Sequence, residues 1–426
     1  MVLLAAALVA GCSHSEQIEA TDDDAPLSTN PPPVAGAQRL AGMMGTAPIT
    51  DVTERFHRRL LGVDPELDET VGAAAAYDAA IVVGLATELA RTDAPSKLAT
   101  EIVGVTGKGR KCYEYEGCRV LMDSGEPIDF DGQSGAILLQ ENGDPGEASF
   151  AVLRMTDAGS VERLAVRSAV AELDDSVHPP VVNPLAGPPA DGHLTIGLVL
   201  PSAGPDAGTA RAQRAGVKLA IAEMNAYGGV LGEPVELIEG DAGQPGSAVA
   251  EATVTDQLAK GVDVIVSPPS SEATAAILPQ VTGAGVVVVS ATATAKDLGA
   301  DDRGLFFRFA PSDALQGRTL ADVVTSEGLL DVTVVAERGD GEALIPDLFT
   351  GLAVAGGSIA STLLFDGGAD VPADLVSSIR GSTGEAWVFL GSNQAVAPVL
   401  RALLAAGSGP SSPRWFASNL SPQLGA

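Results

Sequence analysis

Residues with catalytic chemistry are few in this chain, and their spacing does not build an active site. The sequence has no HExxH or GxSxG pattern, and its four histidines are scattered: His14, His57, His178 and His193. The segment GVTGKGRK (104–111) superficially suggests a phosphate loop, but it lacks the Walker spacing and a strand that leads into a helix. We therefore expect no enzyme, no catalytic residue, no metal and no cofactor.

Two of the three cysteines are close in sequence, Cys112 and Cys118 in KCYEYEGCR. Two thiols at this spacing can close a small loop, and an exported chain would meet an oxidising compartment. A zinc site is the poorer alternative, because two sulfurs with no nearby histidine supply only half of a ligand set. We predict a structural disulfide.

Hydroxyl groups at one strand end are better placed for binding. Ser270 and Ser271 follow the apolar run VDVIV and precede a predicted helix that begins near Glu272. The N-terminus of a helix offers unpaired N–H groups to an anion. Alternatively both serines cap the helix, and capping is compatible with ligand binding.

Composition favours a large α/β protein. The chain has 426 residues, enough for two or three domain-sized units, and 46% of them are hydrophobic but only 4% aromatic. Short aliphatic side chains of this kind suit helix–sheet layers. The formal net charge of −30 excludes nucleic acid as a partner and otherwise indicates solubility.

The start of the chain, MVLLAAALVAGCS, resembles the end of a secretory leader and more specifically a bacterial lipoprotein lipobox. In such lipoproteins the cysteine, here Cys12, carries the lipid. The run is too short to span a bilayer, and it lacks the basic residues that usually open a leader. The alternative is an apolar N-terminus with a chance cysteine. We expect residues 13–39, which are polar, acidic and proline-bearing, to form a disordered tether.

From residue 193 onwards, apolar strands alternate with helical stretches, as in LTIGLVL, VDVIV and VVVV. This spacing predicts parallel sheets with helices on both faces, because strands buried on both sides are almost continuously apolar. The pattern resets near residue 306 and predicts a second doubly wound lobe, which the chain leaves unfinished. Residues 40–165 predict helices and hairpin-like strands but too few parallel strands for a sheet of their own.

Several motifs together resemble the type I periplasmic binding proteins, specifically the leucine/isoleucine/valine-binding group of ABC-transporter receptors. The later motifs are IGLVLPSAGP (196–205), EMNAYGGVLG (223–232), VDVIVSPPSS (262–271), VVSATAT (288–294) and RFAPSDALQG (308–317). The earlier ones are LAGMMGTAP (40–48), AAYDAA (75–80), the cysteine pair, IDFDGQSG (128–135) and NGDPGEASF (142–150). In that family the earlier set would come last.

The resemblance implies two hinged lobes that close over a small polar solute, and it implies the residues that touch the solute. The carboxylate-binding serine of the family maps onto Ser270, with Ser271 beside it. A backbone carbonyl and a threonine hydroxyl map onto Ala293 and Thr294, and Ser202 lies in a loop expected to line the cleft. In the second lobe, an aromatic position falls near Asn393 and an acidic position near Asn419. An amide lacks the charge that makes an ammonium contact strong, so amides, polyols and carboxylates without an amine join amino acids as expected ligands.

We therefore expect a circularly permuted receptor: leader 1–12, tether 13–39, family C-terminal portion 40–165, proline-rich connector 166–192, first lobe 193–305 and second lobe 306–426. Alternatives are an accidental fusion and halves exchanged between chains. The expected role is an exported, lipid-anchored monomer on the bacterial cell membrane that delivers its solute to an ABC permease. A ligand-binding sensor, or a non-transporting lipoprotein that kept the fold, is the alternative function.

Overall fold

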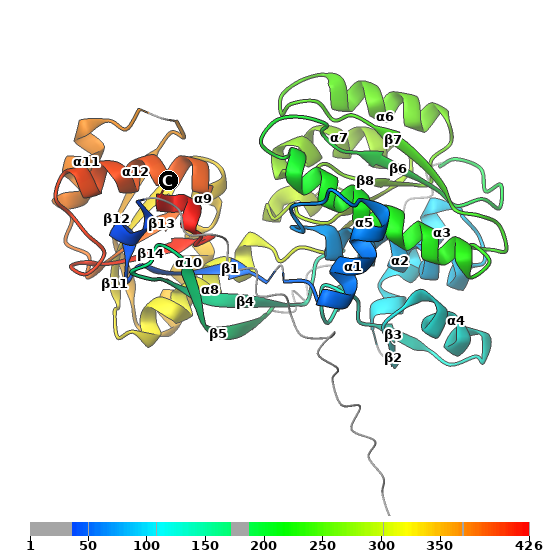
Figure 1. The fold of residues 1–426 in the computed structure, drawn as a ribbon, viewed down its shortest axis with the longest axis horizontal. Helices are drawn as coiled ribbons and strands as arrows, with labels where there is room; N and C mark the ends of the chain where they lie inside the picture. Colours follow the sequence, from blue (N-terminus) through cyan, green and yellow to red (C-terminus); the bar gives the residue numbers. More distant parts are fainter. Residues whose placement is uncertain are drawn as a thin grey trace, which may run out of the picture.

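The computed structural model describes residues 36–49, 51–107, 109–171, 187–300, 302–368 and 370–425, which form two α/β lobes (Figure 1). The predicted leader and Cys12, most of the tether, and residues 172–186 of the predicted connector lie outside the described residues. The α/β fold class predicted from the strand–helix alternation is confirmed.

The first lobe is built on a five-stranded parallel sheet in the order β10-β9-β8-β6-β7. Its strands are β6 (Thr195–Val199), β7 (Glu236–Gly240), β8 (Val264–Val266), β9 (Val287–Ser290) and β10 (Phe306–Arg308). Its helices are α1 (Glu54–Val63), α2 (Ala73–Ala90), α3 (Pro95–Ile102), α4 (Tyr115–Asp123), α5 (Ala207–Ala226), α6 (Val249–Ala259) and α7 (Ser271–Gly283), with 3₁₀ turns η3 (Gly104–Thr106) and η4 (Lys296–Gly299). A two-stranded ladder, β2 (Arg110–Cys112) with β3 (Ile128–Phe130), adjoins them.

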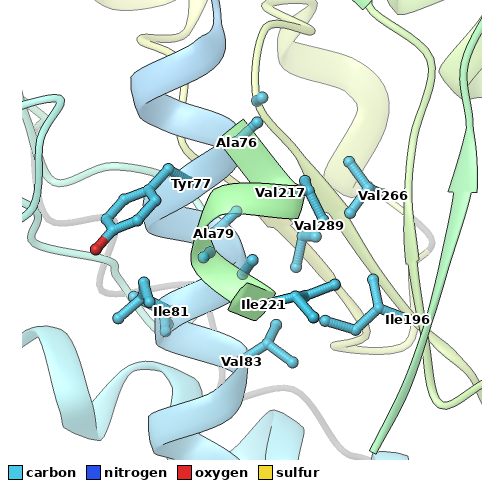
Figure 2. Close-up of a cluster of buried hydrophobic side chains, with 14 of the residues drawn as sticks. Ala76, Tyr77, Ala79, Ile81, Val83, Ile196, Val217, Ile221, Val266 and Val289 are labelled. Carbon is cyan, nitrogen blue, oxygen red and sulfur yellow. The ribbon is translucent and has the colours of Figure 1, made fainter. Parts of the chain in front are cut away.

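Helices cover both faces of this sheet, because successive side chains of a strand point to opposite faces. Ile196, Val266 and Val289 face α2 and α5 (Figure 2). On the other face of the sheet, Val199, Ile265 and Val288 belong to the cluster under α6 and α7. Helix α2 is long and apolar enough to cross a membrane, but 83% of it is buried inside this lobe. It is therefore a buried core helix of the first lobe.

The second lobe has a seven-stranded sheet in the order β12-β11-β13-β14-β1-β4-β5. Its strands are β1 (Met44–Pro48), β4 (Glu147–Met155), β5 (Val161–Val170), β11 (Asp331–Glu337), β12 (Ser358–Phe365), β13 (Ala386–Leu390) and β14 (Arg414–Ser418). The helices are α8 (Asp313–Ser326), α9 (Asp340–Ala343), α10 (Ile345–Val354), α11 (Ala373–Arg380) and α12 (Asn393–Ala405), with 3₁₀ turns η2 (Ala37–Leu40) and η5 (Pro422–Gly425). The predicted hairpin is β4 and β5, which are antiparallel.

Early and late parts of the chain share both lobes. In Figure 1 the blue and blue-green strands β1, β4 and β5 lie in the lobe of the late elements, and helices α1 to α4 lie with the green elements of the other lobe. Strand β1 pairs with β14 in parallel and with β4 in antiparallel, so it is an interior strand. The two ends of the described chain also meet, since a Cβ atom added to Gly36 would lie 2.6 Å from the carbonyl oxygen of Gly425.

Three predicted boundaries were wrong by a few residues. Strand β10 pairs with β9, so residues 306–308 complete the first lobe and do not open the second. Strand β5 continues to Val170, so residues 166–170 belong to the sheet and not to the connector. Residues 37–39 belong to η2, whose Ala37 and Leu40 are buried in the core of the second lobe, and not to the tether. In each case tertiary pairing or burial extends an element past the end of its sequence pattern.

Candidate functional site

A pocket of about 570 Å³ lies where the chain crosses between the two lobes. The crossings are the segments between β1 and α1, between β3 and β4, and between β10 and α8. All three contribute to its walls, together with the start of α2 and the end of β9. Its lining comprises residues 48, 49, 51, 70–72, 74, 75, 134–139, 145, 147–149, 291, 292, 294, 309–311 and 419.

The walls of this pocket are mainly apolar. The large hydrophobic side chains in the wall are those of Ile49, Val71, Ile137, Leu138, Leu139 and Phe309. Hydroxyl and amide groups come from Thr70, Ser134, Ser149, Thr292, Thr294 and Asn419, and carboxyl groups come from Asp51 and Glu147. Among the described residues that line it there is no lysine, arginine or histidine. A pocket of this kind suits a small ligand with an apolar body and a few polar groups.

The N-terminus of α2 opens onto the pocket. Residues 70–72, 74 and 75 line it, and Gly72 occupies the N-cap position with a left-handed φ of 78° and no side-chain cap. An α-helix leaves its first N–H groups without intrahelical partners, and its dipole is positive at this end. The first turn of an eighteen-residue helix can therefore hold a carboxylate without any basic side chain.

Two predicted ligand residues, Thr294 and Asn419, line the pocket. The carbonyl oxygen of Thr294 accepts a hydrogen bond of 3.0 Å from the backbone N–H of Asp313, the first residue of α8. Burial raises the pKa of Asp313 to about 6, although a hydrogen bond from Thr294 lowers it. Asn419 has a left-handed φ of 56°, and its Oδ1 accepts a hydrogen bond of 2.9 Å from Gln316. Thr294 thus connects a first-lobe loop to the start of α8, and Asn419 directly follows strand β14 of the second lobe.

Three other predicted residues lie just behind the pocket wall. Ser270 caps α7 by accepting a hydrogen bond from the N–H of Ala273 at 3.3 Å, so the capping alternative is confirmed for this serine. The Oγ of Ser271 accepts hydrogen bonds from the N–H groups of Thr294 and Ala295, both at 3.1 Å. Ala293 is buried, and its N–H donates to Ser290. The structure thus brings Ser271 and Thr294 together, with the serine shaping the loop that carries the threonine.

Two predicted residues lie away from this pocket. Ser202 donates from its N–H and hydroxyl to Asp241, at 3.1 and 2.8 Å. Asn393 donates from Nδ2 to Ser421 at 2.9 Å, and its Oδ1 is buried without a hydrogen-bond partner among the described residues. A role for either in ligand binding stays a prediction. The predicted disulfide between Cys112 and Cys118 is confirmed, with an S–S distance of 2.07 Å.

Sequence reasoning missed much of the pocket wall: Thr70 to Gly72, Ala74, Ala75, Ile137 to Leu139, and Thr292. The motif AAYDAA does mark α2, but it gives no sign that the turn before it faces the other lobe. The motif IDFDGQSG ends in wall residues 134 and 135, and the motif RFAPSDALQG contains wall residues 309–311, so these two motifs were the available signal. Crossing segments meet only in three dimensions, so their spacing along the chain carries little information about the pocket.

Residues 193–419, just over half of the chain, match the sequence profile of a family described as periplasmic binding protein. The chain belongs to the periplasmic binding protein family. Family membership, which the motifs predicted, implies an extracytoplasmic location for this periplasmic binding protein.

Individual relatives agree with this family. The Leu/Ile/Val-binding protein BraC3 of Rhizobium johnstonii is 33% identical over 175 residues, which are 40% of this chain and 46% of BraC3. The Leu/Ile/Val-binding protein homolog 3 of Brucella melitensis is 30% identical over 149 residues, 34% of this chain and 40% of that protein. This periplasmic binding protein thus aligns with less than half the length of these curated relatives.

Among solved structures, one match is the branched-chain amino acid transporter substrate-binding protein LivJ of Streptococcus pneumoniae in complex with isoleucine. Its TM-score is 0.44 and its sequence identity 24%, over 53% of this chain and 64% of LivJ.

Proposed function

We propose that this protein is an extracytoplasmic receptor that closes its two lobes over a small solute and is not an enzyme. The observation that carries the proposal is the pocket at the crossings, whose walls come from both lobes and from all three connecting segments. A ligand held there contacts the two lobes together only when they are close. It therefore shifts the hinge equilibrium towards the closed form.

The lining supports a ligand with a carboxyl or carboxamide group and an apolar body, such as an amino acid, an amide or a related carboxylate. The first turn of α2 can hold the carboxylate, and the apolar wall around Phe309 and Ile137 can hold the body. Asn419 offers an amide oxygen at the edge of the second lobe, and Gln316 already uses it. The names of BraC3 and its homologue point to branched-chain amino acids as the first compounds to test.

A thermal-shift screen tests this proposal. Amino acids, amides, polyols and small carboxylates are added one at a time, and a true ligand should raise the unfolding midpoint in a dose-dependent way. At a hundred times its Kd a ligand adds about 2.7 kcal/mol to the stability of the folded state. Polyols, which have no apolar body, serve as the internal control. A screen in which no carboxylate or amide stabilises the protein would contradict the proposed ligand class.

We also propose that the chain is a circular permutant of the family fold. Residues 36–171 supply an interior strand and a hairpin to one lobe and four helices to the other, which supports a single folding unit. The packing of η2 on η5 supports a former covalent junction near Gly36 and Gly425. The proposal is tested by whether residues 193–426 can fold without the earlier segment.

The cellular role completes the proposal: a lipid on Cys12 holds a monomeric receptor at the membrane, where it passes its solute to an ABC permease. The lipobox-like residues Val9 to Cys12 support the anchor. Labelling of producing cells with a radioactive fatty acid should mark the wild-type protein and should not mark the Cys12→Ser variant. Equal labelling of both proteins would rule out Cys12 as the anchor.

A further inference from the structure

A fully buried carboxylate lies directly behind one wall of the pocket. Asp78, on α2, accepts hydrogen bonds of 2.7 Å from the backbone N–H groups of Gln133 and Ser134, and a further one from the Ser134 hydroxyl. The turn packs tightly on it, because a Cβ atom added to Gly132 would lie 2.0 Å from Asp78 Oδ1. Only glycine at position 132 permits this approach.

The turn held by Asp78 continues into the pocket wall. Residues 134–139 all line the pocket, and they form most of the wall that the segment between β3 and β4 supplies. At the far end of this segment, the N–H of Leu139 donates to Thr106 at 3.2 Å. The wall is thus attached at one end to Asp78 and at the other to Thr106, both of which are buried in the first lobe.

Asp78 can hold the turn through these three hydrogen bonds only when its carboxyl group is ionised. Burial raises its pKa to about 6, while the hydrogen bonds from Ser134 and Gln133 and the charge of Arg59 lower it. At neutral pH the carboxylate therefore accepts from all three donors. A carboxamide in its place would offer one oxygen and would direct an NH₂ group at a backbone N–H, leaving buried donors unpaired.

We propose that Asp78 is a positioning residue for the pocket: it fixes the turn 132–135, and so holds the wall 134–139 in the shape that accepts a solute, without touching the solute itself. The role of the wall in binding rests on the proposed function. The attachment of the wall to Asp78 does not.

The test compares Asp78→Asn with Asp263→Asn. Asp263 is a second buried carboxylate of the first lobe, which accepts a single hydrogen bond from the N–H of Thr195 and does not line the pocket. Amide hydrogen exchange is followed by mass spectrometry at neutral pH, and the affinity for isoleucine, the probe ligand, by calorimetry. Exchange of the peptide 131–139 is expected to quicken about tenfold or more in Asp78→Asn and to stay unchanged in Asp263→Asn. The affinity for isoleucine should weaken by a similar factor in the first variant alone.

A merely structural role for Asp78 would instead quicken exchange across α2 and β6 as much as in the peptide 131–139. That outcome, or unchanged exchange in 131–139, would overturn the proposal. If Asp78→Asn does not fold, Ser134→Ala removes one of the three donors and should quicken exchange of the same peptide alone. Failure of isoleucine to bind the wild-type protein would exclude isoleucine from the proposed ligands and would leave the exchange comparison decisive for Asp78.

Discussion

Residues 193–426 produced without the earlier segment should fail to fold. The fragment would expose the edge of β14 that β1 covers and would lose α2, which packs along α5 over the sheet of the first lobe. Loss of that many buried side chains far exceeds the 5–15 kcal/mol by which domains of this kind are stable. Trp387 and Trp415, which are stacked and buried in the second lobe, should emit at longer wavelengths in the fragment, and thermal unfolding should show no cooperative transition.

The matched control is a variant that keeps both segments of the chain but places the later segment before the earlier one. A chain that runs from residue 193 to 425 and continues directly at residue 36 should fold, because Gly36 and Gly425 already touch. Its unfolding midpoint should lie within a few degrees of that of the natural chain, with the same tryptophan emission. Cooperative unfolding of the 193–426 fragment, or failure of the rejoined chain to fold, would contradict the permuted arrangement.

Replacement of Asp144 by alanine should cost about 3–5 kcal/mol in the free energy of unfolding. The side chain of Arg308 is completely buried, and both its Nε and Nη2 donate to Asp144 Oδ1, at 2.9 and 2.6 Å. Its Nη1 donates to the carbonyl oxygen of Ala295 at 2.6 Å. Removal of the carboxylate leaves a guanidinium charge in the interior with one neutral partner, at the point where the chain leaves the first lobe for β4.

Urea unfolding followed by circular dichroism measures this cost, and Glu162→Ala is the control. Glu162 pairs with Arg154 on the exposed hairpin of β4 and β5, where both side chains are more than two-fifths exposed. Exposed ion pairs of this type contribute about 1 kcal/mol or less. A loss of less than about 1 kcal/mol in Asp144→Ala would show that the Asp144–Arg308 pair is not a stabilising link.

The candidate site was harder to anticipate than the fold. Ser270 and Ser271 are predicted ligand residues because they follow a strand and begin a helix, and the structure places them at the turn between β8 and α7. The Oγ of Ser271 accepts hydrogen bonds from the backbone N–H groups of Thr294 and Ala295, so it holds the loop that carries Thr294. Whether a serine at a helix start faces a cleft or its own protein depends on the neighbouring loop, and local sequence does not contain that information. The sequence could not predict the hydrogen bonds between Asp78 and the turn that follows β3 for the same reason, since the two donors are 55 and 56 residues away from Asp78.

Sequence patterns alone determined the α/β class, the two doubly wound lobes, the disulfide and the family. These follow from local periodicity, strand burial on both faces and short motifs, all of which are written in contiguous residues. Tertiary structure decided which early elements complete which lobe, where the crossings meet to form a pocket, and how its wall is held. Those properties depend on contacts between residues that are far apart in the chain: β1 with β14, α2 with α5, and Asp78 with the turn at Gly132.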